Sequence, residues 1–218
     1  MKKYIILLSL ILPLMAWSQE RTTNLWTGIS VSKNLTKRIS VELDGQWRLT
    51  DNLSTTGAYI GELGVGYKFN KHWEVSAFYR YISRRKYDKG DEAYVFKQYH
   101  RFYANLNYDR KIAFLKLGYR LRYQDQFKDD NGVLENDKSY IRNKLEISYP
   151  NKTKFTPSIA ADLFYRIGEN FDEVRYKADV DYKINKKNTI TLGGFISHEF
   201  ESTALDNLTI LLSYKLKL

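Results

Sequence analysis

The histidines of this chain are its first candidates for chemistry, and there are three of them. His72 lies at an expected turn, whereas His100 and His198 lie near strand ends on an apolar face. A histidine on such a face with a nearby serine could attack a lipid ester. Ser197 is adjacent to His198, but neighbouring strand residues point to opposite faces, and no Gly-x-Ser-x-Gly elbow is present. A partly solvated interfacial histidine is therefore the favoured interpretation of His100 and His198.

Charged residues that alternate with apolar ones form the larger set of candidates. Residues 39–49 read ISVELDGQWRL, in which every second residue is apolar or small. The same parity, followed along the chain, predicts one charged face. Its members are Glu42, Asp44, Arg48, Glu62, Arg80, Arg101, Arg120, Arg122, Arg142, Lys144, Glu146, Asp162, Arg166, Arg175, Lys177, Asp179 and Asp181.

That charged face has two interpretations if it lines the inside of a barrel. Opposite charges could pair and hold a narrow barrel shut, since an isolated buried charge is costly. Alternatively, arginines could line a small pore that favours anions. The pairing interpretation is favoured, although the surplus of arginine over acids between residues 72 and 149 supports the pore.

Metal and cofactor sites are not expected. The segment KDDNGVLEND offers Asp129, Asp130, Asn131, Glu135 and Asp137, but their spacing does not match the twelve-residue calcium loop. A solvated loop is the better interpretation. With no cysteine and three histidines, a structural zinc site is also improbable.

The elements that must position these residues are strands, because the alternation of period two recurs almost to the last residue. Each expected strand has about 11 to 14 residues, enough to cross a bilayer at a tilt, which takes about 9–11 residues. The expected strands are 23–33, 38–50, 57–69, 72–84, 95–108, 112–125, 139–149, 154–167, 173–184, 188–199 and 207–218.

The connections between these strands also favour a membrane barrel. Short polar turns, expected at 34–37, 70–71, 109–111, 150–153 and 185–187, alternate with longer links at 51–56, 85–94, 126–138, 168–172 and 200–206. Outer-membrane barrels show this asymmetry, and they carry aromatic bands at the strand ends, where Trp47, Tyr67, Trp73 and Tyr165 are expected. The sequence therefore predicts an all-β, transmembrane, antiparallel up-and-down barrel of about ten to twelve strands, with its apolar face toward lipid. The odd count of eleven does not fit bacterial barrels, which are normally even-stranded.

The N-terminus has the layout of a cleaved secretory signal peptide. A basic head is followed by the apolar stretch YIILLSLILPLMAW and by small residues before Gln19. We expect residues 1–18 to be removed and residues 19–218 to form one outer-membrane barrel domain. The formal charge of +10 would then fall to +8, because Lys2 and Lys3 are lost without an acid. Export argues against a nucleic-acid partner for this basic chain.

The opening of the expected barrel resembles a known family. The stretch LWTGISVSKNLTKRISVELDGQWRL, with its Trp-Thr-Gly start and short Lys-rich turn, is similar to the outer-membrane barrels known as domain of unknown function 2490. The resemblance covers residues 23–218. It implies a β-barrel in the outer membrane of a Gram-negative bacterium of the Bacteroidota type, with no known activity and no catalytic residues.

The sequence leaves two functions open. The first is a non-enzymatic, porin-like narrow channel or structural envelope protein. Its expected partners are outer-membrane lipid and lipopolysaccharide, the barrel-assembly machinery and a small anionic solute. The alternative is a lipid-modifying hydrolase of the lipase or deacylase type that uses His100 or His198. The runner-up fold is a soluble lipocalin-like barrel with an apolar interior.

Overall fold

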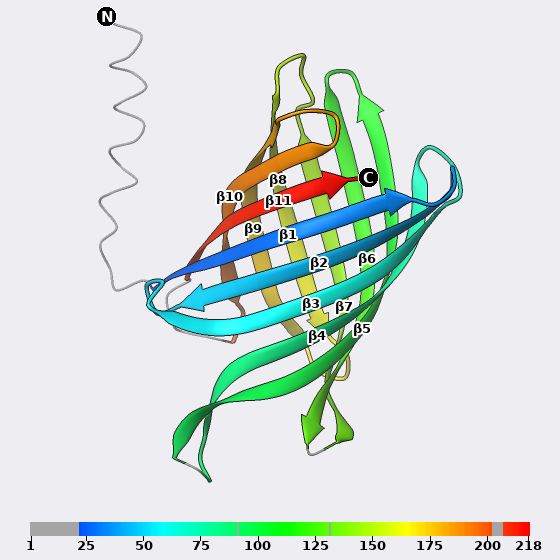
Figure 1. Ribbon diagram of the computed structural model, residues 1–218. Coiled ribbons are helices and arrows are strands. Elements are labelled where there is room, and N and C mark those ends of the chain that lie inside the picture. The colour runs from blue at the N-terminus through cyan, green and yellow to red at the C-terminus, as the bar shows by residue number, and fades with distance from the viewer. Residues whose placement is uncertain (1–21, 91, 131, 202–206) are drawn as a thin grey trace, which may run out of the picture.

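The computed structural model describes residues 22–90, 92–130, 132–201 and 207–218, and the expected signal peptide lies outside these residues. Eleven strands follow one another in this part of the chain (Figure 1). No helix among the described residues is long and apolar enough to cross a membrane. The strands are β1 (Thr23–Asn34), β2 (Ile39–Thr50), β3 (Thr55–Lys68), β4 (Trp73–Asp88), β5 (Ala93–Ile112), β6 (Leu115–Asp130), β7 (Val133–Ser148), β8 (Phe155–Arg166), β9 (Phe171–Lys183), β10 (Asn188–Glu199) and β11 (Leu208–Lys217).

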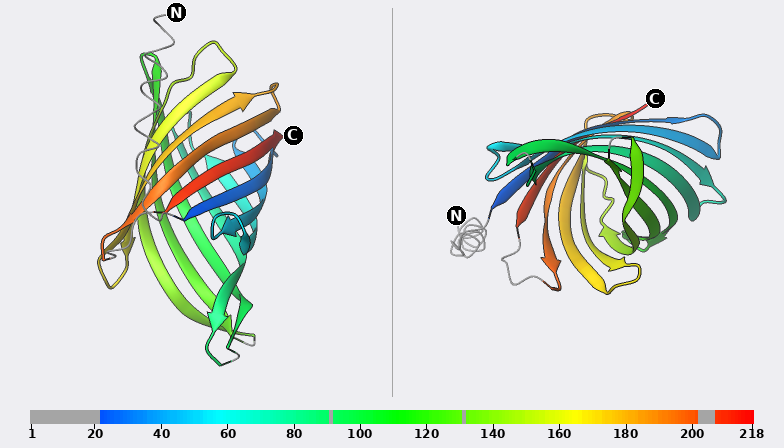
Figure 2. Two further views of the ribbon diagram at one scale, coloured as in Figure 1. Left: turned by 90° about the vertical axis from the view of Figure 1, so that its left-hand side faces the viewer. Right: turned by 90° about the horizontal axis from the view of Figure 1, so that it is seen from below.

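The eleven strands close into one barrel, which confirms the all-β class and the strand count. Each strand is antiparallel to the next along the chain, but the closing pair, β1 and β11, is parallel. Both strands run in the same direction side by side (Figures 1 and 2), with Thr23 opposite Leu208 and Ser32 opposite Lys217. A parallel closing pair is what an odd number of strands requires, so the count of eleven is compatible with a closed sheet.

The two faces of the sheet differ as the alternation predicts. In β2, Leu43 is 60% exposed and Trp47 is 46% exposed on the outer face, while the residue after each of them, Asp44 and Arg48, points inward. This orientation is opposite to that of a soluble lipocalin-like barrel, in which the apolar side chains would fill the interior. Most large apolar residues of the described strands therefore lie on the outside of the barrel.

The boundaries of several connections differ from the prediction. The expected loop 126–138 is wrong, because β6 continues to Asp130 and β7 begins at Val133. Likewise, β4 and β5 extend through most of the expected link 85–94, and the turn expected at 109–111 lies instead at residues 113–114. Figure 1 shows the β4–β5 and β6–β7 hairpins projecting beyond the rest of the barrel. A ribbon exposed on both sides can carry charges on both faces, so its sequence does not alternate.

The tight turns at the opposite end of the barrel are built from asparagines. Asn70 Oδ1 accepts hydrogen bonds from the backbone N–H groups of His72 (2.8 Å) and Trp73 (3.0 Å). Asn185 Oδ1 does the same for Lys187 and Asn188, each at 2.9 Å. Such side-chain bonds to the backbone two or three residues later fix short turns, which explains why Asn recurs at these positions.

Candidate functional site in the barrel lumen

The strand register places every member of the expected charged face on the inner side of the barrel. Directly opposed residues of neighbouring strands share a face, so the inward direction of one residue propagates around the sheet. The series runs from Asp44 to Glu62, then to Arg80 and Arg101. Another part of it joins Arg120 to Lys144 and Lys144 to Asp162. The role of these residues in lining a pore stays a prediction.

About half of the inward cations are paired with carboxylates. Arg80 is paired with Glu62, and Arg142 with Asp162. Lys144 Nζ lies 2.5 Å from Glu146, and Arg175 lies 2.7 Å from Glu173. Further pairs join Lys177 to Asp179, Arg166 to Asp172 and Lys215 to Asp181. These pairs offset part of the cost of enclosing charges.

Four other inward arginines have neutral amide partners instead. Arg48 donates to Gln46 Oε1 (2.8 Å) and Arg120 to Asn107 Oδ1 (2.8 Å). Arg101 Nε donates to Gln126 Oε1 (3.1 Å), and Arg122 Nε donates to Asn105 Oδ1 (2.6 Å). Within the described chain, no carboxylate lies within 4.0 Å of any of these four guanidinium groups. Within the part of the chain that the structure describes, their positive charge is therefore not paired with a carboxylate.

Inward aromatic rings, which the sequence reasoning missed, hold several of these guanidinium groups. Arg48 lies 3.5 Å from the ring centre of Trp26, and Arg122 lies 3.9 Å from that of Tyr103. Tyr103 in turn stacks on Phe78, with ring centres 4.9 Å apart. A cation above an aromatic face is attracted by the ring, so each guanidinium has its plane fixed. The same parity that predicts the inward charges could have identified these rings.

The inward side chains leave an open cavity of about 640 Å³. This volume falls in the range of small-molecule sites, about 300–1,000 Å³. Its basic lining consists of Arg48, Arg80, Arg84, Arg101, Arg120, Arg122, Lys138, Arg142, Arg166, Arg175, Lys177 and Lys215, whereas its acidic lining consists of Asp44, Asp172, Glu173 and Glu199. The cavity is therefore strongly electropositive.

A second cavity of about 240 Å³ lies toward the tight turns, and Arg120 lines both. Its other charged lining residues are Glu74, Asp109, Lys116, Lys144 and Glu146. Arg120 thus stands at the boundary between the two spaces, held there by Asn107.

The inner face is not charged all round. Ala58, Ile60, Ile82 and Tyr99 form a buried apolar cluster on β3 to β5, in which Ile82 is 1% exposed. Gln126, which binds Arg101, is completely buried and also donates to Asp137 Oδ2 at 2.5 Å. These residues fill part of the lumen on β3 to β6, beside the open space that the arginines line.

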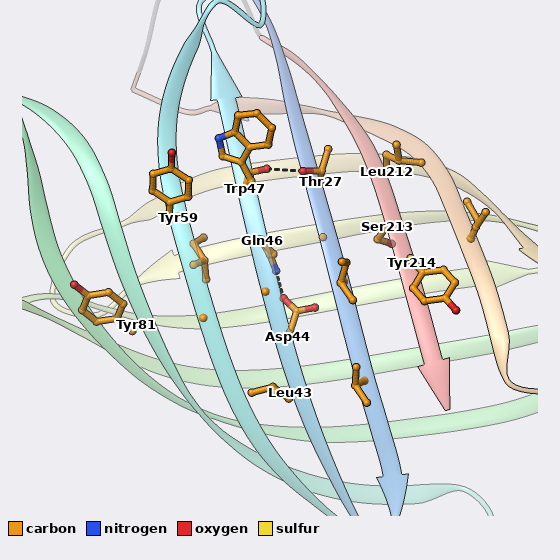
Figure 3. Close-up of a pocket in the computed structure, with 17 residues that line it drawn as sticks. Thr27, Leu43, Asp44, Gln46, Trp47, Tyr59, Tyr81, Leu212, Ser213 and Tyr214 are labelled. Atoms are coloured by element: carbon orange, nitrogen blue, oxygen red, sulfur yellow. Dashed lines mark hydrogen bonds between the residues drawn. The ribbon is translucent and has the colours of Figure 1, made fainter. Parts of the chain in front are cut away.

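The outward face is hollowed over β1, β2, β3 and β11 (Figure 3). Gly45 and Gly61 are directly opposed there, and no atom lies within 4 Å of where their side chains would begin. The resulting depression of about 1000 Å³ is bordered by apolar side chains that include Leu43, Trp47, Tyr59 and Leu212. It belongs to the apolar outside of the barrel.

The histidine candidates lie away from the lumen. His100 Nδ1 lies 2.7 Å from the hydroxyl of Tyr79 and its Nε2 lies 3.6 Å from Asp129, on the outer face. In the described chain no serine hydroxyl forms a hydrogen bond with His100. Ser197 points inward and accepts a hydrogen bond from Arg175 (3.1 Å), so it does not face the outward His198.

The acidic segment does not form a metal site in the described residues. Asp129 accepts a hydrogen bond from the Gly132 N–H at 2.8 Å, which closes the β6–β7 hairpin. Asp137 binds Gln126. These side chains are therefore used in the hairpin itself, and Asn131 lies outside the described residues.

Comparison with known proteins adds a family and a distant structural likeness. A porin whose structure was refined at 1.8 Å resolution aligns with 85% of this chain and 59% of its own, at 10% identity and a TM-score of 0.37. This chain thus spans less than two thirds of that porin. No curated protein matches the sequence. A family model described as protein of unknown function (DUF2490) matches residues 23–209, from the first strand into the last. The chain therefore belongs to the DUF2490 family, as its opening strands led us to expect.

Proposed function

We propose that this protein is a non-enzymatic outer-membrane barrel of a Gram-negative bacterium that gives small anions a narrow passage. The observation that carries the proposal is the set of inward arginines without carboxylate partners around the 640 Å³ cavity. Fixed cations along a pore lower the electrostatic energy of anions and raise that of cations. The amide and aromatic partners hold the charges in place without neutralising them.

Placement in a bilayer is supported by the outward face. A row of exposed Leu, Ile, Trp and Tyr side chains around the whole barrel would be an unusually large apolar patch in water. In a membrane the same residues face lipid, and a closed sheet satisfies every backbone hydrogen bond. Residues 1–18 have the layout of a secretory signal peptide, which would direct the chain to export.

The orientation follows from the connections. In outer-membrane barrels the short turns face the periplasm and the longer connections face outside. In this orientation the β4–β5 and β6–β7 hairpins project from the cell, toward lipopolysaccharide. The larger cavity opens on that side, and an anion would then pass Arg120 to reach the smaller cavity near the turns.

The test is conductance of the folded protein in planar bilayers under a salt gradient. We expect small single-channel steps with a reversal potential that indicates anion selectivity. Arg122→Gln should reduce that selectivity, whereas Arg110→Gln, an exposed position on the same hairpin outside both cavities, should not. Cation selectivity would contradict the proposal, and a barrel without conductance would be a structural envelope protein only.

The hydrolase alternative retains one supporting observation, the contact of His100 with Asp129 and Tyr79. A carboxylate can orient a histidine base, but the nucleophile that such a base would activate is not in contact with it. Lipid turnover by the purified barrel that disappears in His100→Ala would favour the enzyme. Unchanged lipid would exclude it.

A further inference from the structure

We propose that the larger cavity is a binding site for a divalent tetrahedral oxyanion, the chemistry shared by inorganic phosphate, phosphate monoesters and sulfate. Arg48, Arg101 and Arg122 are its ligands. This inference deepens the proposed function, because it names the class of anion that the lumen selects.

The first argument is the number and origin of the free charges. Arg48 comes from β2, Arg101 from β5 and Arg122 from β6, and all three line one cavity. Arg101 lies within electrostatic reach of both Arg48 and Arg122. Three cations held close together without carboxylates repel one another, and a bound anion with a single charge would offset only part of that repulsion. A divalent anion matches the site better.

The second argument is the geometry of the donors. A guanidinium group presents several N–H donors in a rigid planar fork, which suits oxyanions with more than one oxygen. A halide has no such set of acceptors. Forks that arrive from three different strands approach from different directions, and a tetrahedral oxyanion can accept from all of them.

The third argument is a buried donor atom of Arg48 that lacks an acceptor. Among the described residues, the buried Nε of Arg48 has no hydrogen-bond partner. Buried donors without a partner are rare, because each costs free energy. An oxyanion oxygen in the cavity would give this donor its acceptor.

The aromatic residues of the cavity narrow the ligand class further. Trp26 is covered by Arg48, and Arg166 lies 5.7 Å from the ring centre of Tyr140. Phe164 lies 4.0 Å from Arg142. Because the protein's own guanidinium groups occupy these ring faces, the rings are not available to stack on an aromatic ligand. The site therefore recognises the oxyanion group alone.

The experiment is a calorimetric titration of the folded barrel in zwitterionic detergent with inorganic phosphate and with sulfate, at constant ionic strength set by chloride. We expect saturable binding of both anions over the chloride background. Phosphate should bind at least several-fold more tightly at pH 8 than at pH 5, since its second ionisation, which makes it divalent, lies between these pH values. Sulfate, which is divalent throughout, should show no such change.

Four variants locate the site. Arg122→Gln and Arg101→Gln should each weaken phosphate binding about tenfold or more, and Arg110→Gln should leave it unchanged. Arg122→Lys, which keeps the charge but loses the fork, should lie between the wild type and Arg122→Gln. The gel shift on boiling verifies that each barrel is folded, and if one glutamine variant does not fold, the other still tests the site.

The outcomes separate the two proposals. Binding no tighter than that of chloride, or equal binding by Arg122→Gln and Arg110→Gln, would overturn the oxyanion site even if the barrel conducts anions. Tight phosphate binding without any conductance would support the oxyanion site and contradict the proposed channel.

Discussion

Replacing Gly64 with alanine tests whether the inward rings position the arginines. Gly64 lies on the inner face of β3, where an added Cβ would stand 2.0 Å from Cε1 of Phe78. Ordinary contact begins near 3.4 Å, so the ring would have to retreat by about 1.4 Å. Phe78 stacks on Tyr103, and Tyr103 lies under Arg122. The methyl group would therefore disturb the site through two rings without changing any charge.

The size of the effect can be estimated in two parts. Overpacking of this kind costs about 1–3 kcal/mol of unfolding free energy. If Arg122 then loses one charge-assisted hydrogen bond to the anion, worth about 1.5–3 kcal/mol, phosphate affinity falls roughly tenfold or more. Urea unfolding followed by tryptophan fluorescence measures the first quantity, and the phosphate titration measures the second.

Gly61→Ala is the matched control, because Gly61 lies on the same strand with open space beside it. We expect it to leave both stability and affinity unchanged. Phe78→Leu, combined with Gly64→Ala, should recover part of the stability by making room for the methyl group. If Gly64→Ala and Gly61→Ala behave alike in both assays, the stacked rings do not position Arg122 and the reasoning is refuted.

Three further predictions concern the ion pairs, the boundary between the cavities and the outer face. Arg142→Ala should destabilise the barrel by about 3–5 kcal/mol in urea unfolding, because it leaves the buried Asp162 without its cation; equal stability of the two proteins would show that the carboxylate finds another partner. Arg120→Ala should raise single-channel conductance and lower anion selectivity, since Arg120 separates the two cavities; a lower conductance would place the narrowest point elsewhere. Leu43→Arg should lower the free energy of unfolding of the barrel in vesicles by about 2–4 kcal/mol. Leu35→Arg, in a turn where Leu35 is 57% exposed, should lower it little. Similar losses of stability for the two variants would argue against a lipid-facing Leu43.

The alternating strands could be predicted from the sequence because one face of each is uniform. In residues 39–49 the outward positions are apolar or small and several inward ones are charged, so the parity is unambiguous. Around Phe78 the contrast between the faces is weaker, since residues 77–81 read AFYRY and aromatic residues occupy both faces. The parity of Arg80 places Phe78 on the inner face, but its position opposite Gly64 is known only from the strand pairing.

The candidate site was predictable in its members but not in its pairing. Which arginine has a carboxylate partner depends on residues far apart in the sequence, such as Arg142 and Asp162. The amide partners Asn105 and Gln126 carry no charge and therefore gave no signal. The projecting hairpins were missed for a related reason, because charged residues on both faces of an extended ribbon are typical of loops as well.

The parallel pair of β1 and β11 has a consequence for how the barrel is made. It joins the two extremes of the described chain, where Thr22 Oγ1 donates to Asn207 Oδ1 at 2.7 Å across 185 residues. Closing a loop of that length costs about 5 kcal/mol of chain entropy, and the bonds that repay it form only when the last strand has been synthesised. Until then the sheet has two open edges that can pair with other chains. The pairing that closes the barrel therefore joins strands at opposite ends of the described chain, and both edges of the sheet need protection until β11 pairs with β1.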